Sequence, residues 1–540
     1  MVLPEVQSHY GRLRNYVGGT WIEERDGESL PVMNPATARE IAQVPLAAKE
    51  SVEGVVAAAQ EAFPAWRATP PLERARKFFA LRDLMLRDAG VLARIISQDQ
   101  GKTIEEARGE VQRAIENVEV AAGIPSLMMG YGLEDGAAAG VDEEVVSQPL
   151  GVFAGITPFN FPLMVAFWFW PYAVATGNTY VLKPSEQDPV VHQHMFRLIE
   201  EAGFPPGVVN LVNGAKETSE ALIDHPNVQG VSFVGSTPVA KAVYARAGAR
   251  GKRAQCGGGA KNFLVVMPDA RMDRTVEAVL NSAYGMAGQR CLAGSAVVAV
   301  EGVHDAFLEK VRRGAETLRL GSGLDPATDM GPVVSSAAKQ RVESYVDLGA
   351  SEGARLALDG RTATVADYPG YFVGPTILDA VARDMRVARE EIFGPSSAYS
   401  RQIPSTMRSR RFTGASSGTP RRSSRRGGPP RASSGPGFAA GTSGSTWGSP
   451  PRSHTSRSGV RGSRSSGRST GRGGTRSGSS PSTRSSFRGG RRDAHLRKLH
   501  YASVPMPGRP IRRGGFAWRR STGTTSPGSG SRPQAGTRPR

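Results

Sequence analysis

Cys291 is one of only two cysteines in the 540-residue chain, and its neighbours suit a nucleophile. It lies among glycines and small residues in the stretch 285–295, directly after Arg290. Small neighbours leave a thiol accessible, and an adjacent cation favours the thiolate, which is the form that attacks carbonyl carbons. A lone cysteine is more often a small buried hydrophobe. This stretch alone therefore leaves catalysis and packing open as alternatives.

A turn earlier in the chain could bind phosphate. Gly235 and Ser236 follow the apolar stretch 231–234 and precede a helix-compatible run. Ser236 can cap that helix, and Pro238 suits its first turn. Backbone N–H groups at the start of a helix bind anions. Many ordinary strand–helix turns have the same residues, so the indication is weak when taken alone.

Short apolar strands that alternate with helical stretches are predicted to position both features. The first block contains predicted strands at 151–156, 178–182, 208–212 and 231–234. The second contains predicted strands at 262–267, 296–300 and 371–378, with helices from residue 273 and over 303–318. This alternation is typical of parallel βαβ units, whose ligand crevice lies at the carboxyl ends of the strands.

The N-terminal part is predicted to form a hairpin followed by helices. A Gly-Gly pair in the stretch 16–21 separates residues of strand type, which is typical of a tight hairpin. Residues 50–122 have apolar side chains at helical spacing. We expect Ser51 to cap the first helix and Pro71 to start the next one.

The charge of the chain is unevenly divided. Residues 401–540 hold 29 Arg, one Lys and one Asp, a net charge of +29. Subtracting these from the 68 basic and 49 acidic residues of the whole chain leaves 38 and 48 in residues 1–400, a net charge of −10. The body is therefore acidic. The segment 401–540 is rich in Ser, Gly, Arg and Pro and has no apolar periodicity, so we expect it to be disordered.

Export and membrane signals are not evident. The N-terminus lacks an apolar segment behind a basic start, so we expect no secretory signal. The longest apolar run, 161–175, is too short to span a bilayer and is interrupted by prolines, so we expect it to be core. Two cysteines, Cys256 and Cys291, provide no disulfide framework. We expect a cytoplasmic protein without a metal site or a membrane partner.

Six motifs occur in an order that resembles a known superfamily. They are Pro158-Phe-Asn-Phe-Pro162, Lys183-Pro-Ser-Glu186, Phe233-Val-Gly-Ser236, Gly259-Ala-Lys-Asn262, Gly288-Gln-Arg-Cys291 and Glu390-Glu-Ile-Phe-Gly-Pro395. On these motifs, residues about 10–395 resemble the aldehyde dehydrogenase superfamily, and most of all its CoA-acylating methylmalonate-semialdehyde dehydrogenases. The resemblance implies an α/β fold with a Rossmann-like NAD-binding domain and an α/β catalytic domain.

The resemblance also implies roles for individual residues. Cys291 would attack the aldehyde carbon, and the amide of Asn160 would stabilise the oxyanion together with the backbone N–H of the cysteine. Contacts with NAD are implied for Phe159, Lys183, Glu186, Gly235, Ser236, Glu391 and Phe393. An acidic residue at the position of Glu186 favours NAD over NADP, because it would repel a 2′-phosphate. Without the resemblance, Asn160 would be read as a turn residue and Glu391 as surface charge.

Two further features point to the CoA-acylating subfamily. Hydrolytic aldehyde dehydrogenases have a glutamate that activates water at the position of Gly257, and glycine cannot act as a general base. The resemblance therefore implies CoA as co-substrate. It also implies that Arg113 and Arg290 bind the carboxylate of methylmalonate or malonate semialdehyde. Decarboxylation would then give propionyl-CoA or acetyl-CoA, as in valine catabolism. Read alone, Arg113 is equally well a helix-surface arginine, and Cys256 is more simply explained by packing.

We expect three regions in the chain. An NAD-binding domain would span 1–255, with an N-terminal entry segment and candidate oligomerisation strands near 125–150. A catalytic domain would span 256–395 and be incomplete at its C-terminal end. A disordered basic tail would span 396–540, with the composition of a GC-rich message read out of frame. The resemblance implies a dimer or tetramer, which the altered C-terminal part places in doubt for this chain.

Alternative functions remain at this point. One is a hydrolytic aldehyde dehydrogenase with another aldehyde substrate, against which Gly257 argues. Another is an inactive chain derived from an enzyme. A third is a nucleic-acid-binding protein that acts through its basic tail, by charge and stacking. The tail has few aromatic residues and no regular repeat of them, so we expect no specific nucleic-acid partner.

Overall fold

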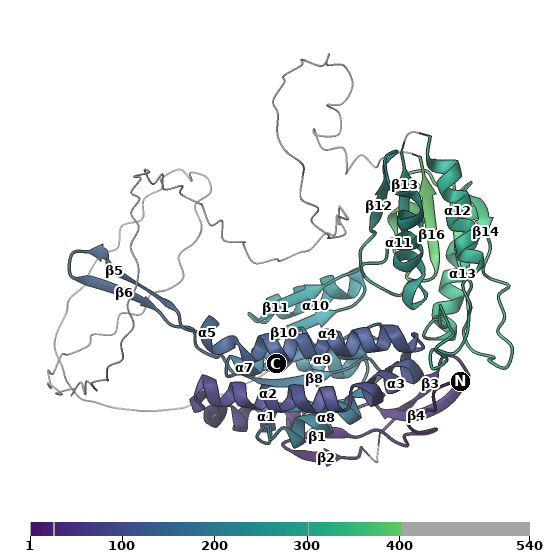
Figure 1. The fold of residues 1–540 in the computed structure, drawn as a ribbon. Helices are drawn as coiled ribbons and strands as arrows, with labels where there is room; N and C mark the ends of the chain where they lie inside the picture. Colours follow the sequence, from purple (N-terminus) through teal and green to yellow (C-terminus); the bar gives the residue numbers. More distant parts are fainter. Residues whose placement is uncertain (1, 25–26, 301, 402–540) are drawn as a thin grey trace, which may run out of the picture. The chain divides into compact units, whose positions relative to one another are not determined.

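Two sheets with mainly parallel strands organise the chain in a computed structural model that describes residues 2–24, 27–300 and 302–401 (Figure 1). The predicted α/β class is confirmed, because strands and helices alternate along the chain as expected. The prediction that residues 401–540 are disordered lies outside the described residues, apart from Arg401.

The first sheet has seven strands in the order β11-β10-β7-β8-β9-β1-β2. The strands are β1 (Asn15–Val17), β2 (Thr20–Ile22), β7 (Val152–Ile156), β8 (Thr179–Lys183), β9 (Val209–Leu211), β10 (Val228–Val234) and β11 (Arg253–Gly257). β11, β10, β7, β8 and β9 are parallel neighbours. The predicted hairpin at 16–21 is confirmed: β1 and β2 pair antiparallel, and β1 extends the sheet beside β9. Parallel strands buried on both faces explain why β7 and β8 read as continuous apolar runs.

Helices pack against this sheet and connect its strands. They are α1 (Lys49–Ala68), α2 (Pro71–Arg87), α3 (Ala89–Gln100), α4 (Ile104–Ala122), α5 (Ile124–Leu127), α6 (Pro162–Phe167), α7 (Trp170–Ala175), α8 (Val190–Glu201), α9 (Lys216–Asp224) and α10 (Thr237–Ala249). Pro71 starts α2 as predicted. The run 161–175 is core as predicted, since α6 and α7 are largely buried. Among the described residues, no helix combines the length and the apolar content needed to cross a membrane.

The predicted cap at Ser51 is wrong. The extended residue Ala48 precedes the helix, and Lys49 already begins it, so Ser51 lies within the first turn. An N-cap side chain contributes only about 1 kcal/mol. The preceding residue, Ala47, is buried and donates its N–H to the Asn213 carbonyl at 3.4 Å. We attribute the earlier helix start to this tertiary anchor.

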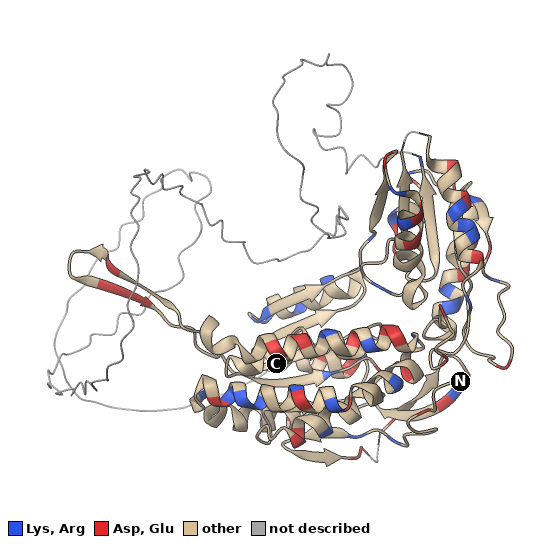
Figure 2. Cartoon of the chain, viewed as in Figure 1, with Lys and Arg blue, Asp and Glu red and all other residues tan. Residues whose placement is uncertain are grey.

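Two hairpins lie outside the main sheets. One pairs β3 (Ser29–Asn34) with β4 (Arg39–Pro45). The other pairs β5 (Tyr131–Ala138) with β6 (Val141–Val145), in the region where we expected oligomerisation strands. The second hairpin is exposed along its whole length and has acidic but no basic side chains (Figure 2). Its apolar side chains Tyr131 and Leu133 are also exposed.

The second sheet has five strands in the order β12-β13-β16-β15-β14. The strands are β12 (Phe263–Val266), β13 (Ala296–Ala299), β14 (Arg355–Leu358), β15 (Thr376–Asp379) and β16 (Ser396–Ser400). The helices of this part are α11 (Met272–Tyr284), the 3₁₀ turn η1 (Gly285–Gly288), α12 (His304–Glu316), α13 (Ser336–Ser351) and α14 (Arg386–Arg389). The predicted strand at 371–378 begins only at Thr376.

Strand β16 corrects the expected end of the folded body at residue 395. It lies between β13 and β15 and pairs parallel with both. The residues of β16, Ser-Ser-Ala-Tyr-Ser, have little apolar content, so no local pattern predicts a strand there. The two neighbouring strands satisfy its backbone hydrogen bonds, and Ser396 and Ser397 are buried. A basic tail beginning at 396 is therefore wrong for residues 396–400. At the other boundary, the expected division after residue 255 falls inside β11.

The core beneath the first sheet contains a cluster of packed aromatic rings. Phe78 on α2 is fully buried, with its ring centroid 5.9 Å from that of Trp170 and 5.2 Å from that of Phe204. Its neighbour Phe79 is 48 % exposed. Adjacent phenylalanines on one helix thus have opposite environments.

Replacement of Phe78 by alanine is expected to lower the free energy of unfolding by about 3–5 kcal/mol, because it removes buried area and leaves a cavity. Denaturant unfolding followed by tryptophan fluorescence measures the change. Phe79→Ala is the matched control and is expected to cost about 1 kcal/mol or less. Equal losses in the two variants would contradict the packing described for this core.

Candidate active site

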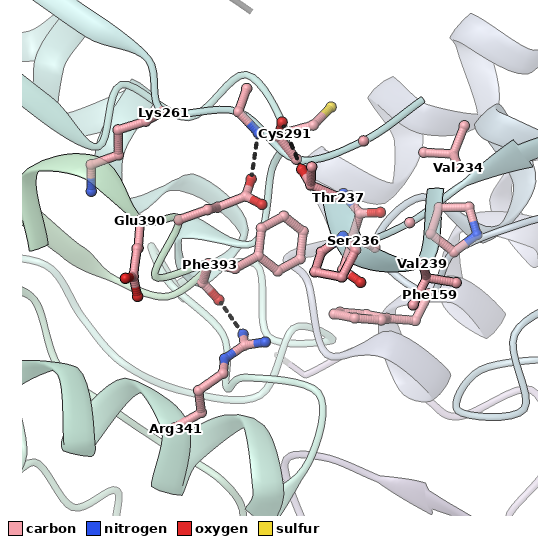
Figure 3. Close-up of a pocket in the computed structure, with 18 of the residues that line it drawn as sticks. Phe159, Val234, Ser236, Thr237, Val239, Lys261, Cys291, Arg341, Glu390 and Phe393 are labelled. Atoms are coloured by element: carbon pink, nitrogen blue, oxygen red, sulfur yellow. Dashed lines mark hydrogen bonds between the residues drawn. The ribbon is translucent and has the colours of Figure 1, made fainter. Parts of the chain in front are cut away.

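A cavity of about 1750 Å³ lies where the predicted residues converge (Figure 3). It is lined from the carboxyl ends of β7, β8 and β10, from the loop that holds Cys291, and from the segment after α14. Parallel strands place such a crevice at their carboxyl ends. Nine of the eleven predicted site residues line it: Phe159, Asn160, Lys183, Glu186, Gly235, Ser236, Cys291, Glu391 and Phe393. Arg113 and Arg290 do not.

The Cys291 loop is fixed by hydrogen bonds from other segments. The side-chain amide of Asn262 donates to the carbonyl oxygens of Cys291 at 2.7 Å and Ala293 at 3.0 Å. At Gly288, which has φ +70°, a Cβ atom would lie 2.0 Å from the Gly394 carbonyl oxygen. Glycine is therefore required where this loop touches the loop that carries Glu391 and Phe393. The predicted nucleophile is partly buried in a rigid setting.

The Cys291 thiol does not have the lowered pKa that its sequence neighbour suggests. Burial raises the pKa, and the carboxylate of Glu391 raises it further. Backbone N–H groups and Arg290 act in the opposite direction, but with smaller effect. Arg290 thus favours the thiolate as expected, yet desolvation dominates. The free protein therefore holds this thiol largely protonated at neutral pH.

Asn160 lies beside the cysteine loop and is buried. Its amide nitrogen donates to the Gln289 carbonyl oxygen at 3.0 Å, so its donor group faces the residues that precede Cys291. The backbone carbonyl oxygen of Asn160 accepts a hydrogen bond from the Lys102 ammonium at 2.8 Å. An amide donor held next to a nucleophile is what oxyanion stabilisation requires.

A buried ion pair supports the Asn160 turn. Lys102 pairs with Glu110 on α4, and both side chains are inaccessible to solvent. The second oxygen of Glu110 accepts from the backbone N–H groups of Leu163 at 2.9 Å and Met164 at 3.1 Å. The Lys102 ammonium also lies 4.5 Å from the ring centroid of Phe161. The pair thereby fixes the chain on both sides of the turn.

The other end of the cavity offers groups that suit a dinucleotide. Gly235 and Ser236 join β10 to α10, and Ser236 is the N-cap residue as predicted, although its side chain makes no cap hydrogen bond. At the end of β8, the Lys183 ammonium lies 3.0 Å from a carboxylate oxygen of Glu186. Burial lowers the pKa of Lys183, and Glu186 opposes that shift. The two residues thus form a pair at the cavity wall.

Aromatic rings and charged groups meet between these two ends. The rings of Phe159 and Phe393 are 5.7 Å apart in an edge-to-face arrangement. Arg341 donates to the Phe393 carbonyl oxygen at 3.3 Å (Figure 3). One oxygen of Glu391 accepts from the Ala260 N–H at 3.4 Å. Of the predicted nicotinamide-side residues, Glu391 therefore contacts the segment after β11, and Phe393 contacts Phe159 after β7.

The three consecutive glycines 257–259 differ in how much space surrounds each position. A Cβ on Gly259 would lie 2.0 Å from a carboxylate oxygen of Glu391, so glycine at this position leaves room for the Glu391 carboxylate. A Cβ on Gly258 would be tight against Thr237, at 3.1 Å. At Gly257 the nearest atom would be 3.4 Å away, which is ordinary contact. Position 257 therefore has room for the first atom of a side chain.

The two predicted carboxylate-binding arginines have protein partners. Arg113, on α4, is exposed and pairs with Glu116 at 2.6 Å. The Arg290 guanidinium donates to the carbonyl oxygens of Ser282, at 3.0 Å, and Asn281. The buried Nε of Arg290 has no partner among the described residues. In the described structure, both guanidinium groups therefore bind other protein groups, and neither lines the cavity.

Several residues around the site were not predicted from the sequence. The Lys261 ammonium, beside Glu390 in Figure 3, lines the cavity, and burial lowers its pKa to about 8. Arg341, Lys102 and Glu110 were also missed. They lie far from Cys291 in sequence and have no local signal. Glu106, also missed, did have a local signal in the sequence, because Thr103 and Glu106 form the S/T-x-x-E/Q pattern of a capping box.

Comparison with known proteins agrees with this geometry. Residues 21–398 match the model of the family described as "Aldehyde dehydrogenase family". The chain belongs to the aldehyde dehydrogenase family. The match covers the first sheet except β1 and the first residue of β2, and the second sheet except the last two residues of β16. Among the described residues, no group of three or more His, Cys, Asp or Glu side chains is arranged to hold a metal ion.

Within the aldehyde dehydrogenase family, the chain is similar to proteins named malonate- or methylmalonate-semialdehyde dehydrogenase. The chain is 47 % identical over 383 residues to malonate-semialdehyde dehydrogenase 2 of Geobacillus kaustophilus, covering 71 % of this chain and 79 % of the relative. The crystal structure of methylmalonate-semialdehyde dehydrogenase from Oceanimonas doudoroffii has a TM-score of 0.72 and 42 % identity, covering 73 % of this chain and 81 % of that one. A "putative methylmalonate-semialdehyde dehydrogenase" of Sinorhizobium meliloti 1021, complexed with NAD, has a TM-score of 0.71 and 41 % identity, covering 73 % and 80 %.

Replacement of Lys102 by methionine is expected to lower the free energy of unfolding by about 3–5 kcal/mol, because Glu110 would remain buried without its cation. Chemical denaturation of the full chain measures the loss. The control is Arg108→Met, which removes an exposed ion pair with Glu105 on the same helix. Such pairs contribute little, so its free energy of unfolding should hardly change. A similar small change for Lys102→Met would contradict the role assigned to the buried pair.

The raised pKa of the Cys291 thiol predicts its reactivity as a function of pH. The thiolate is the reactive form, so the rate of alkylation by iodoacetamide should rise with pH and continue to rise above the ordinary thiol pKa of about 8.5. Glu391→Gln removes a charge that raises this pKa, and should move the curve to lower pH. Mass spectrometry of the Cys291 peptide gives the rates. A curve already flat at neutral pH would show that desolvation does not dominate.

Proposed function

We propose that this chain is an NAD-dependent, CoA-acylating semialdehyde dehydrogenase that acts on malonate or methylmalonate semialdehyde. The observation that carries the proposal is the meeting of Cys291 and Asn160 in one cavity, near a residue 257 that has no side chain. The relatives named malonate- and methylmalonate-semialdehyde dehydrogenase support the substrate class. We further propose that the NAD-binding and catalytic regions divide near the end of β11.

The cavity fits NAD in its donor groups. The turn at Gly235–Ser236 begins α10, where backbone N–H groups suit a pyrophosphate. The Lys183–Glu186 pair is suited to ribose hydroxyl groups, and the acid disfavours a 2′-phosphate. Phe159 and Phe393 provide apolar walls toward Cys291. The NAD complex of the Sinorhizobium meliloti relative supports this assignment. When bound, NAD supplies a hydride acceptor.

The protein residues would carry the chemistry as follows. The Cys291 thiolate forms a C–S bond with the aldehyde carbon, and the carbonyl oxygen becomes an oxyanion. The Asn160 amide and the backbone N–H of Cys291 stabilise that charge. Loss of hydride from the same carbon leaves a thioester on Cys291. The raised pKa of the free thiol means that it must lose its proton before attack.

Release of the acyl group distinguishes the CoA-acylating reaction from hydrolysis. Water needs a general base to attack a thioester efficiently. Gly257 provides none, although its position has room for the first atom of a side chain. A thiol is a better nucleophile than water, so CoA would take the acyl group and free Cys291. With a carboxylate on the substrate, loss of CO2 gives acetyl-CoA or propionyl-CoA.

Arg290 and Arg113 remain our proposed ligands for the substrate carboxylate. Arg290 directly precedes Cys291 and has an unpaired buried Nε among the described residues. Arg113 lies on α4, the helix that also carries Glu110, but its guanidinium would have to leave Glu116. We also propose that the exposed β5–β6 hairpin joins copies of the chain in a homo-oligomer.

The test is NADH formation by the full chain with malonate semialdehyde. Without CoA, wild type should form NADH only in a burst stoichiometric with active sites, and CoA should make turnover continuous. Gly257→Glu installs a carboxylate and should raise CoA-independent turnover about 100-fold, the usual size of a general-base effect.

Two variants serve as controls for this experiment. Gly257→Gln has the same size as the glutamate variant but no base, and should stay dependent on CoA. Cys291→Ala should abolish the burst. Continuous CoA-independent turnover by wild type would refute the CoA-acylating assignment, and retained turnover by Cys291→Ala would refute the nucleophile.

A further inference from the structure

Glu106, in the first turn of α4, connects that helix to the Cys291 loop. One carboxylate oxygen accepts from the Thr103 N–H at 3.0 Å and completes the capping box. The other oxygen accepts from the Met286 N–H at 2.7 Å, across 180 residues of sequence. Capping uses only one of the two oxygens, so the second contact is additional to the helix start.

The Met286 contact falls on an unusual piece of backbone. Met286 and Ala287 have φ values of +53° and +50°, and Gly288 has +70°. Left-handed conformations are unfavourable for residues with a side chain and persist only where the surroundings enforce them. Met286 and Ala287 are also buried. This turn leads directly through Gln289 and Arg290 to Cys291.

The charges of Glu106, Arg290 and Cys291 also interact with one another. Burial lowers the pKa of Arg290, and the Glu106 carboxylate and the Cys291 thiolate both oppose that shift. The Arg290 side chain in turn bonds the Ser282 carbonyl at the end of α11. Glu106 therefore acts on the loop through both a backbone hydrogen bond and a nearby charge.

We propose that Glu106 is a positioning residue for the nucleophile: its carboxylate holds the left-handed turn 286–288 and so fixes where Cys291 stands. The role of Cys291 as nucleophile rests on the proposed function above, but the positioning can be measured without turnover. A carboxylate is needed because two N–H groups require two acceptor oxygens. Glutamine has one acceptor oxygen and would place an NH2 group against the second N–H.

Alkylation of the two cysteines by iodoacetamide tests the proposal in the full chain. Loss of the Met286 hydrogen bond should let the loop open more often. In Glu106→Ala, which leaves neither acceptor oxygen, Cys291 should therefore react at least about tenfold faster, the effect of losing a hydrogen bond to a charged group. Cys256, on the edge strand β11, is the internal control and should keep its wild-type rate.

Two further variants separate positioning from helix stability. Thr103→Val removes the other half of the capping box but leaves the Glu106–Met286 bond, so Cys291 should react at nearly the wild-type rate. Glu105→Gln, on the exposed face of the same turn, should also behave as wild type. Three results would overturn the proposal: an unchanged Cys291 rate in Glu106→Ala, equal acceleration of Cys291 and Cys256, or an equal effect of Thr103→Val.

Discussion

The buried pair of Lys102 and Glu110 is the interaction on which the site geometry depends. Both charges are removed from water, so each needs the other and further hydrogen-bond partners to offset the cost of desolvation. Those partners are the backbone groups of Asn160, Leu163 and Met164. The requirement to satisfy a buried charge thus fixes the turn that presents the Asn160 amide. A neutral pair could not impose the same constraint so strongly.

Helix α4 also constrains the turn before Cys291. Its beginning is fixed by Thr103 and Glu106, and the spare oxygen of Glu106 reaches the turn before Cys291. Lys102, just before α4, and Glu106, in its first turn, therefore bond the backbone of Asn160 and the turn before Cys291, which belong to different parts of the chain. The loops bearing Cys291 and Glu391 are in turn locked by close backbone approach at Gly288. Reactive groups held by a shared support need little rearrangement during reaction.

The environment of Cys291 sets a chemical requirement for the enzyme. Burial and Glu391 raise the pKa of the thiol in the free protein, so the attacking form is scarce at neutral pH. Within the proposed function, glycine at position 257 provides no general base for hydrolysis of a thioester on Cys291. The same site would therefore protect the acyl group until a thiol arrives.

The sequence by itself determined the fold class and the strand–helix alternation, because apolar periodicity is a local signal. Its ordered motifs, through their resemblance to a known family, indicated nine residues that line one cavity. It could not reveal strand β16, since Ser-Ser-Ala-Tyr-Ser becomes a strand only when two neighbours supply its hydrogen bonds. It also could not show that desolvation outweighs Arg290 at Cys291, or that Glu110 supports Asn160. Those outcomes depend on burial and on contacts between distant segments, which only the tertiary structure decides.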